Sequence, residues 1–333
     1  MVRTGHEETF VIVRWGLDSL AAVLDELSLE RPLLISTERW RELDLPIERR
    51  FYGAKPHADV TGVRTAQAML DDVDGLVALG GGSALDTTKA VSSESGLPIV
   101  SIPTTYSGAE WTTSFGMRDS ERQTKAGGGG ARPEAIVYEP RLSLELPPGE
   151  TGGTALNALA HCAEALYTWG HGPETDEQAL EGARLISRWL PVVLERGNDP
   201  QARRGLLEGA MHAGSALRAG MGVGHAMAQA LGGRYGIPHG AMNAVCLPPA
   251  LRFNRQAAAG GIERLGRAMG AGDAIERVGE LATLACSPRL RDYGVPREEL
   301  GAVAEASAAR APARCNPRPA PAEEIVVLLE EVW

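Results

Sequence analysis

Apolar residues repeat with two different periods in the first part of the chain. Three- and four-residue spacing at residues 17–29 and 59–72 predicts amphipathic helices. Short apolar runs bounded by polar residues or glycine predict buried strands at residues 32–37, 49–53, 74–79 and 98–103. Because strands that alternate with helices pair in parallel, the pattern predicts an α/β domain with a doubly wound parallel sheet.

The pattern changes near Pro147–Gly149. From residue 149 to the end, helical periodicity dominates, so we place a domain boundary there and expect an α/β domain over 1–148 and an all-helical domain over 149–333. Residues 306–321 are rich in Ala, Arg and Pro, and we interpret them as a surface crossing without chemistry.

A run of four glycines, Gly127–Gly130, interrupts a β-like portion at residues 114–141. Such a run is typical of a mobile loop over a site or of a plain linker, and we slightly favour the mobile loop.

Length and charge limit the classes of function. A chain of 333 residues is long enough for two domains. A net charge of −10 argues against a nucleic-acid partner and means that an anionic substrate would need a local positive site. No apolar run is long enough for a membrane span and the amino terminus lacks a signal core, so we expect a cytoplasmic protein. The four cysteines form no Cys-x-x-Cys pair, which favours free thiols over a structural zinc site.

Three histidines and one asparagine stand out in the second half. Asn157 and His161 lie four residues apart on one face of a predicted helix, His225 lies on another helix, and His239 lies at a Pro-His-Gly turn. Their neighbours are mostly Ala, Gly and Leu, which leaves these polar groups few partners except one another, a ligand or an ion. A single histidine of this kind is usually a satisfied structural residue, but four such residues together indicate a site.

Glycines Gly80–Gly82 follow the strand at 74–79 and precede a predicted helix. Backbone N–H groups at such a turn can approach a pyrophosphate, and Ser83 can cap the helix or donate to phosphate. Thr104 and Thr105 follow the next strand, where a ligand of an open α/β sheet would lie. The alternatives are a tight turn for the glycines and capping roles for the threonines.

These motifs, in this order and together with Asn316–Pro319, resemble the iron-containing alcohol dehydrogenase superfamily, and more narrowly its maleylacetate reductase branch. The resemblance implies a dehydroquinate synthase-like fold, a nicotinamide cofactor (NADH or NADPH) in a cleft between the two domains, a small-molecule substrate and a homodimer. It assigns the cofactor-binding positions to Gly80, Gly81, Gly82, Ser83, Asp86, Lys89, Thr104, Thr105 and Ser107.

Two positions depart from the metal-dependent members of that superfamily. An aspartate that ligates the ion there corresponds to Asn157 here, and a further histidine corresponds to Gln229. Without an anionic ligand a site gains little from a divalent cation. We therefore expect metal binding to be weak or absent; if Fe or Zn is bound, its ligands would be His161, His225 and His239.

The resulting hypothesis is an NAD(P)H-dependent reductase of a small oxo acid, ketone or aldehyde. Either His225 or His239 would protonate the developing oxyanion, while His161 and Asn157 would bind the substrate. Three close imidazoles would titrate together and give an anion a local positive pocket. The alternatives are a metal-dependent alcohol dehydrogenase, a non-redox lyase or cyclase on the same fold, and a binding protein without activity. The basic residues Arg118, Lys125 and Arg132 are candidates for binding a carboxylate, although we favour surface solvation as their role.

Overall fold

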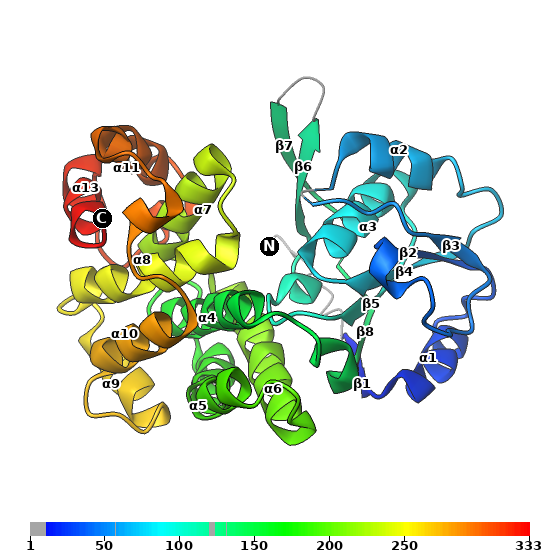
Figure 1. The fold of residues 1–333 in the computed structure, drawn as a ribbon, viewed down its shortest axis with the longest axis horizontal. Coiled ribbons are helices and arrows are strands. Elements are labelled where there is room, and N and C mark those ends of the chain that lie inside the picture. Colours follow the sequence, from blue (N-terminus) through cyan, green and yellow to red (C-terminus); the bar gives the residue numbers. More distant parts are fainter. Residues whose placement is uncertain (1–10, 57, 120–123, 131) are drawn as a thin grey trace, which may run out of the picture. The chain divides into compact units, whose positions relative to one another are not determined.

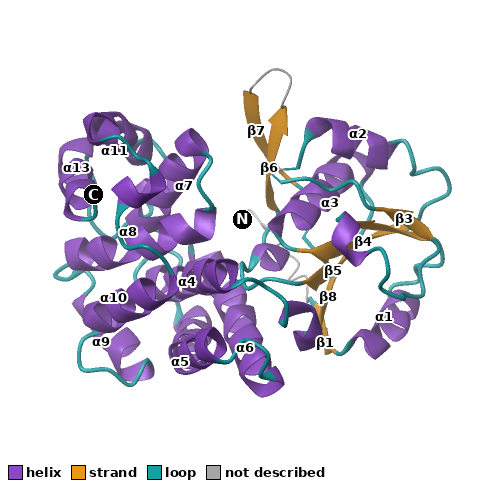
Figure 2. Cartoon of the chain, in the orientation of Figure 1, coloured by secondary structure: helices purple, strands orange, loops and turns teal. Residues whose placement is uncertain are grey.

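The computed structural model describes residues 11–56, 58–119, 124–130 and 132–333. The chain divides into two compact units, one made of Met1–Thr104 and Ala109–Glu139 and the other of Thr105–Gly108 and Pro140–Trp333. Among the described residues, all strands belong to the first unit, and the second is helical (Figure 2). The elements of the first unit are β1 (Ile12–Trp15), α1 (Leu20–Glu26), β2 (Pro32–Ser36), β3 (Arg49–Phe51), α2 (Val60–Gln67), β4 (Gly75–Gly80), α3 (Gly82–Ser95), β5 (Ile99–Pro103), β6 (Ser114–Asp119), β7 (Thr124–Gly129) and β8 (Ala135–Tyr138).

Six parallel strands form the main sheet, in the order β1-β8-β5-β4-β2-β3. The predicted doubly wound α/β architecture is therefore confirmed, and each strand predicted up to residue 103 is present. The apolar pattern did not predict β1. This edge strand is only partly buried, and the exposed Arg14 interrupts its apolar residues Ile12, Val13 and Trp15.

Both faces of the sheet are buried. Leu33, Leu76 and Ile99 point to one face, where they form a core with residues of α2 and α3. Figure 1 shows these two helices beside each other against the sheet. The neighbouring positions Leu34 and Val77 point to the opposite face and have no exposed surface. Strands covered on both sides need continuous apolar runs, which explains why these strands were readable from the sequence.

The glycine run has a different structure from the one predicted. Gly127, Gly128 and Gly129 belong to β7, which pairs antiparallel with β6. A Cβ atom at Gly128 would lie 2.6 Å from the Phe115 ring of β6, so the missing side chain makes room for that ring. The prediction of a mobile loop or linker was wrong for these residues because the pairing with β6, which the run alone does not reveal, holds them in a sheet.

The second unit is a helical array. Its main helices are α4 (Pro148–Ala165), α5 (Pro173–Glu195), α6 (Pro200–Ala216), α7 (Val223–Tyr235), α8 (His239–Asn254), α9 (Ala259–Ala268), α10 (Ala274–Ala285), α11 (Leu300–Ala308), α12 (Ala311–Arg314) and α13 (Ala322–Glu331). One apolar core joins α7 and α8 to α11 and α13. None of the helices among the described residues is both long and apolar enough to span a bilayer.

Residues 306–321 are not a simple surface crossing, which corrects the prediction for part of that segment. Asn316 is buried and exchanges two amide hydrogen bonds of 2.8 Å with Asn254. Its side-chain oxygen also accepts a hydrogen bond from the backbone N–H of Val223, at 3.2 Å. The segment therefore fixes the first turn of α7.

Candidate active site

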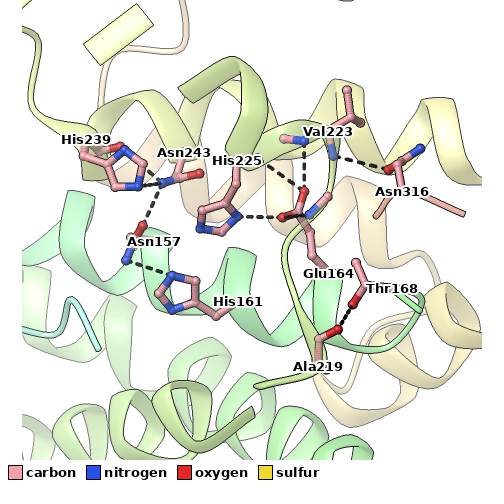
Figure 3. A network of polar contacts seen from close by, with 12 residues as sticks. Asn157, His161, Glu164, Thr168, Ala219, Val223, His225, His239, Asn243 and Asn316 are labelled. Atoms are coloured by element: carbon pink, nitrogen blue, oxygen red, sulfur yellow. Dashed lines mark hydrogen bonds and ion pairs between the residues drawn. The ribbon is translucent and has the colours of Figure 1, made fainter. Parts of the chain in front are cut away.

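Three helices of the second unit bring the predicted polar residues together (Figure 3). On α4, positions four and seven residues apart share a face, because an α-helix turns once every 3.6 residues. Helix α7 contributes a histidine from its first turn, and α8 contributes residues from its first two turns. The residues of this cluster are Asn157, His161 and Glu164 on α4, His225 on α7, and His239 and Asn243 on α8.

Two glycines allow α4 and α8 to approach closely. A Cβ atom at Gly240 would lie 2.5 Å from the backbone carbonyl of Gly153, a distance that real side chains do not tolerate. The close approach of the two backbones therefore requires glycine at both positions. This contact sets the separation between Asn157 and Asn243, which lie one turn further along their helices.

A chain of amide hydrogen bonds starts at a backbone carbonyl. Asn157 Nδ2 donates to the carbonyl oxygen of Ser107 at 2.8 Å, which fixes the orientation of that amide. Asn157 Oδ1 then accepts from Asn243 Nδ2 at 2.7 Å. The same two amide nitrogens lie 3.3 Å from His161 Nε2 and 2.9 Å from His239 Nε2. Since an amide NH₂ only donates, both imidazole nitrogens act as acceptors, and each ring carries its proton on Nδ1.

The electrostatics of these two histidines agree with neutral rings. Burial, followed by the charge of His225, lowers the pKa of His161 well below its usual value. Crowding by protein atoms lowers the pKa of His239 as well, with smaller contributions from His225 and Arg310. The His239 residue as a whole is solvent-exposed. The expected pocket of three readily charged imidazoles is therefore not what the structure contains.

His225 has a different partner. Its Nδ1 lies 2.6 Å from Oε2 of Glu164, and both side chains have no exposed surface. The Glu164 carboxylate also accepts backbone N–H groups of Gly222 at 2.7 Å and Gly224 at 2.9 Å, around the first turn of α7. The N-terminus of a helix favours a negative charge, so the buried carboxylate is stabilised where it lies. The sequence analysis assigned Glu164 no role, although its position three residues after His161 places it on the same helical face.

Three buried polar atoms of the cluster have no hydrogen-bond partner among the described residues: His161 Nδ1, His225 Nε2 and Asn243 Oδ1. The Asn243 oxygen is turned away from His239 in Figure 3. Buried polar atoms are nearly always satisfied in folded proteins. The cluster thus offers a small oxygen-containing ligand the Nδ1–H of His161 as a donor and the Asn243 oxygen as an acceptor, while His225 Nε2 accepts in the neutral ring and donates in the protonated one.

The same contacts do not suit a metal ion. Ligation requires the imidazole lone pairs, and here amide hydrogens occupy them at His161 Nε2 and His239 Nε2. Within the described ranges, no three His, Cys, Asp or Glu side chains are arranged to hold a metal. As they stand, the residues do not fit the ion for which the family is named; the expectation that the protein binds none stays a prediction.

The predicted phosphate loop lies at the carboxyl end of β4. Gly80 has a φ of +148°, which favours glycine, and Gly81 is the N-cap of α3. Ser83 is the second residue of α3 and not its N-cap, so the predicted capping role for Ser83 is not realised. Thr104 N donates to the Gly80 carbonyl at 3.1 Å, which brings the ends of β4 and β5 together. Free N–H groups at the start of a helix suit a phosphate.

The structure places Asp86 and Lys89 on α3, one turn apart. Lys89 is fully buried, and its ammonium donates to the Ala109 carbonyl, Thr112 Oγ1 and the Ser114 carbonyl at 2.6, 2.9 and 3.1 Å. Desolvation lowers the pKa of Lys89 to about 8 and raises that of Asp86 to about 6. All three acceptors of the Lys89 ammonium lie in the segment that leads into β6, so we assign Lys89 a structural role. Its predicted role in cofactor binding stays a proposal.

Thr105 and Ser107 belong to the second unit, unlike the glycine loop. Thr105 Oγ1 donates to Ser107 Oγ at 3.3 Å, and the backbone carbonyl of Ser107 orients Asn157. The structure thus gives Ser107 a contact within the histidine cluster. Arg132, one of the basic residues considered for a carboxylate, is solvent-exposed.

Comparisons with known proteins agree with this architecture. Residues 11–140 match the family model for iron-containing alcohol dehydrogenase, and residues 151–333 match that for the Fe-containing alcohol dehydrogenase family, C-terminal. The chain is 35% identical to a maleylacetate reductase of Burkholderia cepacia, over 96% of this chain and 93% of that protein. It is 34% identical to a maleylacetate reductase of Sphingobium indicum, over 95% and 94%. The crystal structure of maleylacetate reductase from Rhizobium sp. strain MTP-10005 superposes with a TM-score of 0.91 at 31% identity, covering 100% of this chain and 98% of that one.

Proposed function

This chain belongs to the iron-containing alcohol dehydrogenase family and is an NAD(P)-dependent oxidoreductase, and we propose that it reduces a small oxo acid of the maleylacetate type. The observation that carries the proposal is the buried pair Glu164–His225, which leaves His225 Nε2 without a protein partner beside two neutral histidines. The non-redox lyase or cyclase gains no support from the comparisons. A homodimer and a cytoplasmic location stay predictions.

A reductase must stabilise the negative charge that develops on the substrate oxygen. Maleylacetate has a ketone conjugated with a carbon–carbon double bond, so a hydride can add at the carbonyl carbon or at the far alkene carbon. Both additions place the charge on the ketone oxygen, as an alkoxide or an enolate, and a positioned donor stabilises it. When bound, the nicotinamide supplies the hydride, and the protein supplies orientation and the proton.

His225 is the histidine whose surroundings suit proton donation. Glu164 accepts the Nδ1 proton, so Nε2 is the atom left to face a substrate. The buried carboxylate also fixes the orientation of the His225 ring, as in other acid–base pairs. His161 and His239 accept amide hydrogens at Nε2 instead, so we assign the donor role to His225 rather than to His239. The neutral rings and Asn243 Oδ1 then serve as hydrogen-bonding groups that orient the substrate and its product.

The cofactor is assigned to the first unit. We place the pyrophosphate at Gly80–Gly82 and the first N–H groups of α3, with Thr104 at the end of the adjacent strand. The glycines and the strand end are the features that support this assignment. Whether NADH or NADPH is preferred stays open, because Glu38, which would suit a ribose hydroxyl, pairs with Arg41, which would suit a 2′-phosphate.

The experiment that tests the function compares His225→Gln with His212→Gln. His212 is a partly buried histidine on α6 that bonds Gln178, outside the cluster, and serves as the matched control. We expect His225→Gln to lower the rate of NAD(P)H oxidation with maleylacetate by about 10²- to 10⁴-fold, the usual contribution of a general acid. NADH binding, followed by its fluorescence, should not change. Wild-type turnover in His225→Gln would contradict the assignment.

A further inference from the structure

A cavity of about 450 Å³ lies in the helical unit and shares no lining residue with the histidine cluster. Its walls come from the turn that follows α4, from the end of α11, from α12 and from the segment between α12 and α13. Alanine and proline make up most of the lining, together with Trp169, Asn316 and two arginines. The volume is that of a site for a small organic molecule, and it is too small for a helix of a partner protein.

Trp169 forms an aromatic wall of this cavity. Its relative exposure is 79%, although it adjoins the apolar proline and alanine lining. The backbone on both sides of the ring is held in place, because Thr168 Oγ1 and the Gly170 N–H both donate to the carbonyl oxygen of Ala219, at 2.8 and 3.2 Å. The exposed indole is therefore presented by a fixed turn, as a surface on which an aromatic ring can stack.

The cavity is also positively charged. Arg318 pairs with Glu324 and lies over the Phe253 ring, at 4.1 Å from its centroid. Arg314 donates to the Ala309 carbonyl at 3.2 Å, and within the described ranges no carboxylate pairs with it. No acidic side chain is among the described residues that line the cavity. In a chain of net charge −10, this cavity therefore offers an anion a local positive site.

Hydrogen bonds join two walls of the cavity to the first turn of α7 (Figure 3). Asn316, in one wall, accepts from the backbone N–H of Val223 at 3.2 Å. The tryptophan wall is joined to Ala219, three residues before the N-cap of α7, by the two contacts described above. That first turn carries His225 and donates backbone N–H groups to Glu164. The cavity is thus attached to the turn that positions His225.

We propose that this cavity binds a small aromatic carboxylate as an effector, and that the bound ligand restrains the first turn of α7. The aromatic ring of the ligand stacks on Trp169 against the proline lining, and its carboxylate accepts hydrogen bonds from Arg314. A ligand that bridges these two walls opposes any local opening that separates them, and the walls are tied to residues 219–223. The ligand differs from the substrate, since it reaches none of the cluster residues. The inference goes beyond the proposed reductase function and does not depend on it.

Binding is tested by calorimetry on the full chain without substrate or cofactor, with naphthoate as the aromatic carboxylate and naphthamide as its uncharged counterpart. We expect saturable naphthoate binding that is at least about 10-fold weaker in Trp169→Ala and about 5- to 10-fold weaker in Arg314→Gln. Naphthamide should bind the wild type about as weakly as naphthoate binds Arg314→Gln. Both replaced side chains are exposed, so the two variants should keep the wild-type urea midpoint.

The controls are Trp40→Ala and Arg188→Gln, two residues outside the cavity, and both should bind naphthoate as the wild type does. Absence of saturable binding, or equal binding by the wild type and Trp169→Ala, would overturn the site. Equal affinity for naphthoate and naphthamide would overturn the assignment of a carboxylate.

Hydrogen–deuterium exchange of the backbone amides of residues 219–225 tests the restraint on α7. At a naphthoate concentration of ten times its dissociation constant, we expect exchange there to slow by about 10-fold, because opening of the turn then requires release of the ligand. Trp169→Ala should show no slowing at the same concentration. Saturable binding that leaves exchange of these amides unchanged would overturn the effector role.

Discussion

Replacing Glu164 by glutamine tests how the protein holds His225. The substitution keeps the size of the side chain but removes its charge, and it exchanges one acceptor oxygen for an NH₂ donor. The native carboxylate accepts from His225 Nδ1 at 2.6 Å and from the backbone N–H groups of Gly222 and Gly224 at 2.7 and 2.9 Å. A glutamine cannot accept from all of them, so at least one buried donor loses its partner.

The size of the effect follows from that arrangement. Hydrogen bonds to a charged group contribute about 1.5–3 kcal/mol each, and breaking a buried pair by removing one partner costs about 3–5 kcal/mol. The charge that disappears had its own desolvation cost, so we take about 3–5 kcal/mol for the loss of unfolding free energy. For catalysis, a histidine in the wrong tautomer or orientation should lower kcat by about 10²-fold or more.

The assay combines three measurements on Glu164→Gln: urea unfolding, steady-state kcat and KM with maleylacetate, and NADH binding. The control is Glu299→Gln, which breaks the more exposed ion pair with Arg234 and should change the unfolding free energy by at most about 1 kcal/mol. We expect kcat to fall while NADH binding persists. A variant with nearly wild-type stability and kcat would refute the view that Glu164 holds and orients His225.

Three further predictions follow from other contacts. Gly240→Ala should force α8 away from the Gly153 carbonyl, lower the free energy of unfolding by about 1–3 kcal/mol and reduce kcat. The control Gly260→Ala, whose added Cβ meets no atom within 4 Å, should change neither quantity. Equal behaviour of the two variants in urea unfolding and turnover assays would contradict this prediction. Asn157→Asp should replace the amide donor by an anionic ligand, so the variant should retain about one Zn²⁺ per chain after dialysis, as measured by elemental analysis. Equal zinc contents in the wild type and the variant would refute the view that the Asn157 amide prevents metal binding. Arg203→Met should lower unfolding free energy by about 2–5 kcal/mol, because the buried guanidinium donates to backbone carbonyls and hydroxyls beside the start of α4; an unchanged urea midpoint would contradict this.

The sequence predicted most of the fold because the central strands are buried on both faces and therefore read as continuous apolar runs, such as residues 74–79. It failed where pairing or context decides the structure. The glycines 127–129 form a strand only because β6 lies beside them. Strand β1 lies at an edge, and the exposed Arg14 interrupts its apolar residues, so the pattern did not read as a buried strand.

The candidate site was predicted in part, for physical reasons. His161, His225 and His239 stood out by residue type, and the structure brings them together. Their protonation could not be read from the sequence, because it depends on which amide or carboxylate each ring meets across helices. Glu164 was missed because a glutamate in a helix is usually solvated; only its burial and its contact with His225 single it out.

The central claim is hydride transfer from a nicotinamide cofactor to an oxo acid. The most direct test incubates the protein with NADH or NADPH deuterated at the transferable position of C4 and with maleylacetate, with and without EDTA, and then locates deuterium in the product by mass spectrometry and NMR. We predict one deuterium bound to carbon in each product molecule, at the carbonyl or the far alkene carbon, and the same yield with EDTA. Product without deuterium, or no product with either cofactor, would contradict the proposed function.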